Sequence, residues 1–208
     1  MWVVWVVWVV WLPLAYLLGT FPSAQLVARA NGLDITAFGS GNPGASNVTR
    51  ALGWRKGIWV FVFDAAKGAI AAGIGLVVDG RPAGYLLGAA AVLGHVYPAT
   101  RRFRGGKGVA TGGGVLLVML PIVGVSVILL WWVVTKVTGT AAVGSIVAVL
   151  AAGVGLSVKG APAWEFAAAL GLCALVLVRH AGNVRRLVRR EEPTLRSTDA
   201  RSGPRAPA

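Results

Sequence analysis

The segment 94–111, GHVYPATRRFRGGKGVAT, holds the residues whose types and spacing best suit chemistry on an anion. Glycines let backbone N–H groups converge on one point, and the arginines and the lysine supply positive charge. The apolar run that begins at Val109 can start a helix there, and the unpaired N–H groups of a helix N-terminus favour an anion. We therefore predict a phosphate or carboxylate site in which Lys107 supplies charge. Its other ligand-binding residues are expected to be Gly105, Gly106, Gly108 and Thr111.

The pattern differs from that of a nucleotide-binding P-loop. A P-loop has a glycine five residues before Gly106, where this chain has Arg101, and Ser or Thr after Lys107, where it has Gly108. ATP is therefore not the indicated ligand. A loop that only follows the positive-inside rule would explain the arginines, but it would not explain the glycines around Lys107.

A second glycine-rich segment, GSGNPGASNVTR at 39–50, satisfies the spacing G-x-G-x-x-G. We reject a dinucleotide site, because that motif needs a preceding strand and a βαβ unit, and because Asp64, the acid at the expected spacing, lies in an apolar run. The remaining hydroxyl, amide and guanidinium groups suit a polar, anionic ligand. An ordinary turn with a helix cap at Asn47 explains the segment equally well. The candidate binding residues are Ser40, Asn42, Asn47 and Arg50.

A third group of polar residues, RHAGNVRR at 179–186, follows the last apolar run. His180 and Asn183 stand at i and i+3, so they share a helix face. They are either part of a site at the membrane surface or ordinary residues of a helix C-terminus, where cations suit the helix dipole.

Other catalytic classes find little support. The chain has two histidines and one cysteine, widely spread among few acids, so no metal site is predicted. No serine is arranged with His and Asp as in a hydrolase. Within the apolar runs, Asp64 and Lys67 at i and i+3 predict a structural ion pair that could also orient Lys107 or Arg50. Glu165, near the start of the last run, is expected at the membrane interface.

These residues must be positioned by membrane helices. Of 208 residues, 56% are hydrophobic and only 13% are charged, whereas a soluble domain has about 25% charged residues. We predict one integral membrane domain over residues 1–192 and a disordered cytoplasmic tail over 193–208. The net charge of +13 fits the positive-inside rule and anionic headgroups. Nucleic acid is not an expected partner, since the cations lie in loops beside apolar runs without a nucleic-acid motif.

Hydropathy predicts an all-α bundle, and charge predicts its orientation. If the basic regions 29–56, 101–107 and the tail from Arg179 are all cytoplasmic, an even number of spans must follow residue 107. Breaking the 26-residue run 109–134 at Pro121 meets this condition and leaves a first helix of about 12 residues, too short to cross a ~30 Å core. The prediction is seven spans with the N-terminus outside and the C-terminus cytoplasmic; the alternative is six spans. The apolar runs are 2–28, 57–78, 83–97, 109–134, 139–158 and 161–178.

The three polar segments resemble, in order, the three cytoplasmic motifs of the bacterial acyl-phosphate:glycerol-3-phosphate acyltransferases. The resemblance covers about residues 14–192 and includes the spacing of Asp64, Lys67 and Gly68. Departures are small: Ser46 stands where the family usually has Thr, Pro43 fills a variable position, and Arg190 stands where Gly commonly precedes the acidic residue of the third motif. The segment 101–104, RRFR, replaces apolar residues and lysine.

The resemblance implies a seven-span enzyme of the inner membrane that acylates glycerol 3-phosphate from acyl phosphate, without a cofactor, giving lysophosphatidic acid. It also implies work alongside the soluble enzyme that makes acyl phosphate. By this resemblance Lys107, Arg50 and His180 would be catalytic, and Ser40, Arg50, His180 and Asn183 would hold glycerol 3-phosphate. Either His180 or the donor phosphate could accept the hydroxyl proton. A transporter of organic phosphates is the rival class, disfavoured because no inverted repeat is evident.

Overall fold

The computed structural model describes residues 2–158 and 162–195, and within these ranges every regular element is a helix. The predicted all-α class is therefore confirmed. Most of the predicted tail, 196–208, lies outside the described residues, although Leu195 donates its N–H to Gly139 O at 2.7 Å. The helices are α1 (Trp2–Gly19), α2 (Ser23–Arg29), α3 (Ala45–Leu52), α4 (Trp54–Val96), the 3-10 helix η1 (Ala99–Arg101), α5 (Val109–Met119), α6 (Pro121–Thr138), α7 (Ala141–Val158), α8 (Ala163–Val178) and α9 (Ala181–Val188).

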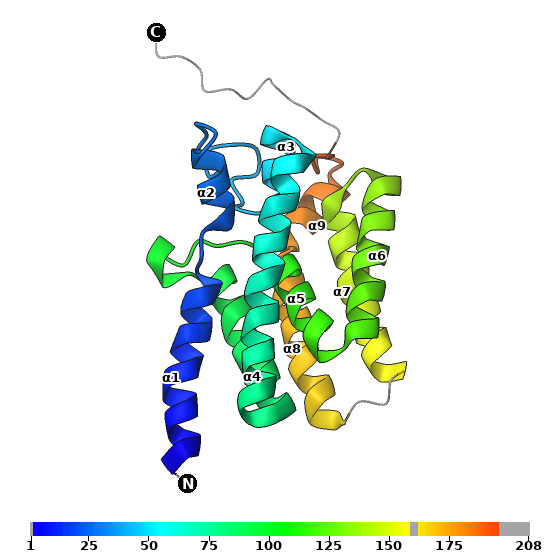
Figure 1. The fold of residues 1–208 in the computed structure, drawn as a ribbon. Helices are drawn as coiled ribbons and strands as arrows, with labels where there is room; N and C mark the ends of the chain where they lie inside the picture. Colours follow the sequence, from blue (N-terminus) through cyan, green and yellow to red (C-terminus); the bar gives the residue numbers. More distant parts are fainter. Residues whose placement is uncertain (1, 159–161, 196–208) are drawn as a thin grey trace.

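The long helices run side by side, and the short helices α2, α3 and α9 gather at one end of the bundle (Figure 1). The outward faces of the long helices are apolar: Val9 is 69% exposed, Ile122 84% and Val137 80%. Valine-rich segments such as α1 would suit strands in water, but in lipid a helix pairs every backbone N–H and C=O within one segment. The chain is therefore built as a membrane protein.

The predicted breaks in the apolar runs are confirmed where a local backbone feature causes them. The helix α5 ends at Met119 and α6 begins at Pro121, as the parity argument required. The runs 57–78 and 83–97 are separated by a turn inside α4 at Asp79 and Gly80, where Gly80 has φ 72°. The run 2–28 forms two helices, α1 and α2, which are separated at Pro22. The residue before a proline is disfavoured in the α conformation, so the first helix ends before it.

Length and composition identify three described stretches that can cross a membrane: Trp8–Arg29, Trp54–Arg101 and Pro121–Thr138. A fourth is reached if α8 and α9, bent by 49°, form one span. The helix α5 and the apolar part of α7 are shorter. The structure thus contains apolar helices at all the predicted positions. Only some of these helices are long and apolar enough by themselves to cross a membrane.

Glu165, which the sequence places at the membrane interface, is buried and paired inside the protein. Its side chain is only 4% exposed and forms an ion pair with Arg81, and it accepts a hydrogen bond from Tyr85 Oη at 2.8 Å. Arg81 follows the turn inside α4 and reaches across to the start of α8. The pair removes the cost of an isolated charge inside the bundle.

Two glycines let α4 and α5 cross in close contact. A Cβ at Gly68 would collide with the carbonyl oxygen of Thr111, and a Cβ at Gly114 would collide with the carbonyl oxygen of Ala65. This crossing matters for the site, because α5 starts directly after Lys107.

We expect Gly114→Ala to destabilise the protein by about 1–3 kcal/mol, because the added methyl group must push α5 away from α4. Thermal unfolding of the purified protein in detergent measures the effect. Gly73→Ala is the matched control: Gly73 also lies inside α4, but no atom lies within 4 Å of the position that its Cβ would take, so this variant should be at least as stable as the parent. Equal stability of the two variants would contradict the close crossing.

Candidate active site

The three polar segments predicted from the sequence meet at one pocket at the end of the bundle where α3 and α9 lie. Eight of the predicted site residues line it, and three do not: Gly105, Gly106 and Thr111. Asp64, His95 and Glu192 also line it, and none of these three had been assigned to a site. The predicted residues on its wall are Ser40, Asn42, Asn47, Arg50, Lys107, Gly108, His180 and Asn183.

The first segment is held by a small core and by one buried amide. Ile35 and Val48 are nearly fully buried beneath it. Asn47 donates from Nδ2 to the carbonyl oxygens of Ile35 (3.2 Å) and Phe38 (2.9 Å) and accepts from Arg50 at 3.0 Å. The alternative of a helix cap at Asn47 is wrong, since Gly44 is the N-cap of α3. Asn47 therefore shapes the loop and aims the Arg50 guanidinium, which also lies 3.4 Å from Ser40 Oγ.

The second segment is seated on the end of α4. Gly106 donates its N–H to His95 O at 3.1 Å, and a Cβ at Gly105 or Gly106 would collide with His95. Tyr16 of α1 fastens the segment from the other side, donating to Tyr97 O at 2.8 Å and accepting from Ala99 N at 2.9 Å. Close packing against His95 is thus the visible reason for these two glycines, and the N–H of Gly106 is already in use.

Lys107 projects from this segment into the pocket, and among the described residues its ammonium group has no hydrogen-bond or ion-pair partner. The pKa of Lys107 is lowered to about 8, chiefly by burial and also by the neighbouring Arg186, Arg50 and Arg179, against the opposing effect of Glu192. Burial also lowers the pKa of Arg50, which nevertheless stays charged. The cations here outnumber the nearby acids, which favours an anionic ligand.

His180 lies in the turn between α8 and α9 and is 2% exposed. Its Nδ1 is 2.7 Å from Val176 O, and because a carbonyl can only accept, Nδ1 carries the proton. Burial lowers the pKa of His180 to about 4, so the ring is neutral at pH 7. The lone pair of Nε2 is then available as a hydrogen-bond acceptor on the pocket wall.

Glu192 is the counter-charge of the site. Its side chain is 7% exposed and accepts from Asn183 Nδ2 at 2.6 Å and from Arg186 Nε at 2.8 Å. A Schellman turn after α9 returns the chain to this position, with Glu191 N bonded to Arg186 O and Arg190 N to Leu187 O. Arg190 has φ 59° there, which explains why glycine suits the position. Sequence reasoning could have found Glu192 only through its place at the end of the third motif.

The predicted ion pair of Asp64 and Lys67 is confirmed, at 2.7 Å, but it orients neither Lys107 nor Arg50. Asp64 instead accepts from Ser23 Oγ at 2.5 Å, and Lys67 lies 3.1 Å from Phe21 O and 3.0 Å from His95 Nδ1. The pair thus supports the seat of the second segment.

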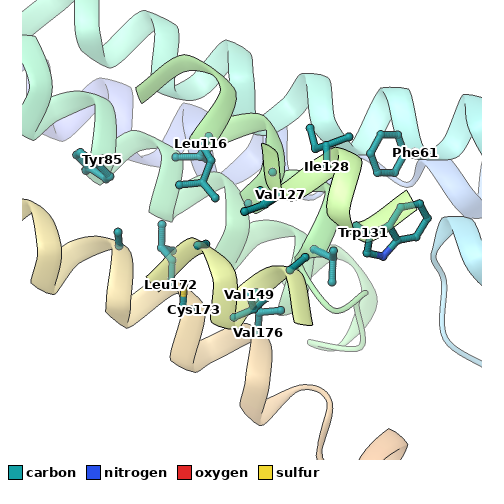
Figure 2. A pocket seen from close by; sticks show the side chains of 17 residues that line it. Phe61, Tyr85, Leu116, Val127, Ile128, Trp131, Val149, Leu172, Cys173 and Val176 are labelled. Atoms are coloured by element: carbon teal, nitrogen blue, oxygen red, sulfur yellow. The ribbon is translucent and has the colours of Figure 1, made fainter. Parts of the chain in front are cut away.

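An apolar pocket adjoins the polar one, and the two share Phe61, Val109 and Trp131. Figure 2 shows Phe61 and Trp131 near one end of the apolar pocket and Tyr85 near the other. Gly112 and Gly113 line it, and no atom lies within 4 Å of a Cβ built on either, so open space rather than packing faces them. The arrangement can hold a molecule with an anionic head and an apolar chain. Among the described residues, no group of three or more metal-ligating side chains gathers anywhere.

The pKa of Lys107 predicts how anion binding depends on pH. Lys107 is charged below about pH 8 and loses its charge above it. We expect affinity for sulfate, whose own charge is constant over this range, to fall at least about 10-fold from pH 7 to pH 10, as a charged hydrogen bond is lost. Isothermal titration calorimetry of the purified protein measures it.

Lys107→Arg should remove this fall, because a guanidinium group stays charged throughout. Lys56→Arg, at an exposed position of α4, is the control and should keep the dependence of the parent. A pH-independent affinity in the parent would contradict the assignment.

Comparison with known proteins shows the family of this chain. The sequence profile of the family described as glycerol-3-phosphate acyltransferase matches residues 9–190. The glycerol-3-phosphate acyltransferase of Bacillus cytotoxicus is 40% identical over 185 residues, covering 88% of this chain and 92% of that protein, and that of Myxococcus xanthus is 42% identical over 183 residues, covering 86% and 95%.

A crystal structure of PlsY, an integral membrane glycerol 3-phosphate acyltransferase, in its glycerol 3-phosphate form has 38% sequence identity and a TM-score of 0.84, covering 88% of this chain and 93% of that one. The lysophosphatidic acid form gives a TM-score of 0.82 with the same coverage. Since the profile spans most of the chain and the relatives align over nearly their whole length, the chain belongs to the glycerol-3-phosphate acyltransferase family.

Proposed function

We propose that this protein transfers a fatty acyl group from acyl phosphate to the hydroxyl group of glycerol 3-phosphate, forming 1-acyl-glycerol 3-phosphate and phosphate. The observation that carries the proposal is the junction of the cationic pocket with the apolar one through Phe61, Val109 and Trp131. One substrate has a phosphate head and an acyl chain, and the other has only a phosphate head. Relatives named for the reaction, and PlsY structures with glycerol 3-phosphate and lysophosphatidic acid, support this assignment.

The chain's own contribution is positioning and charge. The apolar pocket takes the acyl chain, so the carbonyl carbon lies near Val109, at the start of α5. Lys107 and Gly108 contact the donor phosphate, while Arg50, Ser40 and Asn183 hold glycerol 3-phosphate, with Asn42 and Asn47 completing that wall. Lys107 and Arg50 offset the mutual repulsion of the two phosphate-bearing molecules. Holding the molecules together aligns hydroxyl and carbonyl, which can supply ~7–11 kcal/mol of the barrier. Gly105, Gly106 and Thr111 do not line the pocket, and Gly105 and Gly106 act by seating the second segment on His95.

His180 orients the attacking hydroxyl by accepting its hydrogen bond at Nε2. A pKa of about 4 makes its ring a poor proton carrier at neutral pH. The C–O bond to the glycerol oxygen forms, the bond from the carbonyl carbon to the phosphate oxygen breaks, and the hydroxyl proton passes to the departing phosphate. The donor phosphate thereby acts as the base, because its bridging oxygen becomes more basic as the anhydride bond breaks.

The remaining features of the proposal concern placement. Domain 1–192 forms seven spans in the inner, cytoplasmic membrane, with the N-terminus outside and the C-terminus cytoplasmic. The break between α5 and α6 and the basic residues of the loops that meet at the polar pocket support this orientation. The pocket then opens toward the cytoplasm, where a soluble acyl-phosphate-forming enzyme would deliver the donor.

Incubation of the purified protein with acyl phosphate and glycerol 3-phosphate tests the function. We expect 1-acyl-glycerol 3-phosphate to form, and Lys107→Ala and Arg50→Ala each to raise the barrier by about 2–4 kcal/mol in kcat/KM, the scale of a lost oxyanion contact. Lys56→Ala is the control at an exposed position. Near-parental turnover in Lys107→Ala would contradict the role assigned to Lys107. Protein that moves glycerol 3-phosphate across vesicles without acylating it would be a transporter instead.

Two substitutions at His180 separate orientation from base catalysis. The side-chain oxygen of Gln can accept a hydrogen bond near the place of Nε2, but Gln cannot take up a proton. We expect His180→Gln to recover most of the kcat lost in His180→Ala, with KM for glycerol 3-phosphate measured in parallel. If both variants lose kcat equally while KM stays unchanged, His180 is the general base.

A further inference from the structure

We propose that His95 is a further binding residue of this site: its Nε2–H donates a hydrogen bond to a phosphoryl oxygen of the bound substrate, and Lys67 fixes the tautomer that makes this possible. The tautomer is a property of the free protein and follows from geometry alone. The hydrogen bond to a phosphoryl oxygen rests on the proposed function, because it needs a phosphate in the pocket.

The tautomer of His95 follows from the hydrogen-bond inventory of its neighbour. The ammonium group of Lys67 has three N–H donors and no acceptor. Its three polar neighbours are Asp64 Oδ1 at 2.7 Å, Phe21 O at 3.1 Å and His95 Nδ1 at 3.0 Å. Because Lys67 can only donate, Nδ1 of His95 must accept. A neutral ring that accepts at Nδ1 carries its proton on Nε2.

A protonated His95 would not fit this arrangement. Two cationic donors would then face each other across 3.0 Å inside the protein, while Asp64 Oδ1 is 3.5 Å from Nδ1 and already accepts from Ser23 and Lys67. The neutral, Nε2-protonated ring leaves every one of these groups with a suitable partner.

The free Nε2–H of His95 faces the second segment of the site. A Cβ built on Gly106 would collide with this nitrogen, so Nε2 lies directly against the backbone that precedes Lys107. His95 lines the polar pocket together with Lys107 and Gly108. Among the described residues Nε2 has no hydrogen-bond partner, although the residue is only 6% exposed. A nearly buried N–H donor on the wall of a cationic pocket can be satisfied by an acceptor from the ligand.

The two histidines of the chain therefore have opposite roles. His180 is held with its proton on Nδ1 and offers an acceptor, whereas His95 is held with its proton on Nε2 and offers a donor. An acceptor suits a substrate hydroxyl, and a donor suits a phosphoryl oxygen that bears negative charge.

Nuclear magnetic resonance of protein labelled with ¹⁵N only in histidine tests the tautomer directly. The chain has two histidines, so, in protein freed of any histidine tag, His180→Gln leaves the signals of His95 alone. We expect the one-bond N–H coupling of His95 on Nε2 and none on Nδ1, and a shift of the Nε2–H signal when inorganic phosphate is added. A proton on Nδ1, protons on both nitrogens, or an Nε2–H signal unmoved by saturating phosphate would each overturn the proposal.

Paired substitutions test the contribution to binding. The amide nitrogen of Gln can stand near Nε2 of histidine, whereas that of Asn stands near Nδ1. We expect His95→Asn to weaken inorganic phosphate binding roughly 10- to 100-fold, the loss of one hydrogen bond to a charged acceptor, and His95→Gln to recover most of it. Equal losses in both variants at parental thermal stability would show that His95 acts only in packing. If neither variant folds, the tautomer and the phosphate-induced shift, both measured with His95 intact, decide.

These readouts separate the two levels of the proposal. Phosphate binding and the tautomer are measured without acyl phosphate, so they do not depend on acyl transfer. A parent protein that binds phosphate through His95 but makes no 1-acyl-glycerol 3-phosphate would refute the proposed function and leave the role of His95 standing. If the His95→Asn variant acylates glycerol 3-phosphate as efficiently as the parent, the proposed function stands and the role of His95 is refuted.

Discussion

The buried ion pair between Asp64 and Lys67 is the interaction on which the active end of the bundle depends. Each group is about 3% exposed, and together they connect the junction of α1 and α2, the first half of α4, and the end of α4 at His95. Buried pairs contribute little net stability, but removal of one partner costs about 3–5 kcal/mol. The effect of the pair here is geometric. It holds His95 in place, and the second polar segment packs on His95 through Gly105 and Gly106, which directly precede Lys107.

Positive charge exceeds negative charge around the polar pocket. Lys107, Arg50 and Arg186 surround Glu192, which is held by Asn183 and Arg186, while Asp64, the other carboxylate on the pocket wall, is paired with Lys67. The Schellman turn that brings Glu192 back places Arg190 in a left-handed conformation, a local cost of roughly 1–2 kcal/mol. Glu192 holds the loops together but does not balance all of the positive charge around it, so the remaining positive charge is available to an anionic substrate.

The sequence predicts those parts of this structure that are set by nearby residues. The break at Pro121, the turn near Gly80 and the start of α5 at Val109 each follow from the backbone preferences of a few residues. Convergence of the three motifs could also be expected, since all were assigned to one membrane face. The roles of Asn47, Gly106 and Glu165 could not, because each depends on a partner brought near only by tertiary packing. Glu165, for example, meets residues 80 and 84 positions away.

The shared wall of the two pockets has a consequence for the lipid that leaves the site. Phe61, Val109 and Trp131 hold the boundary between a region that suits water-soluble heads and one that suits hydrocarbon. A single-chain amphiphile formed across that boundary already has its head and its tail on the sides that a monolayer requires. Escape sideways between the helices would therefore place it in the leaflet of its synthesis, with no need to rotate or to cross an aqueous gap.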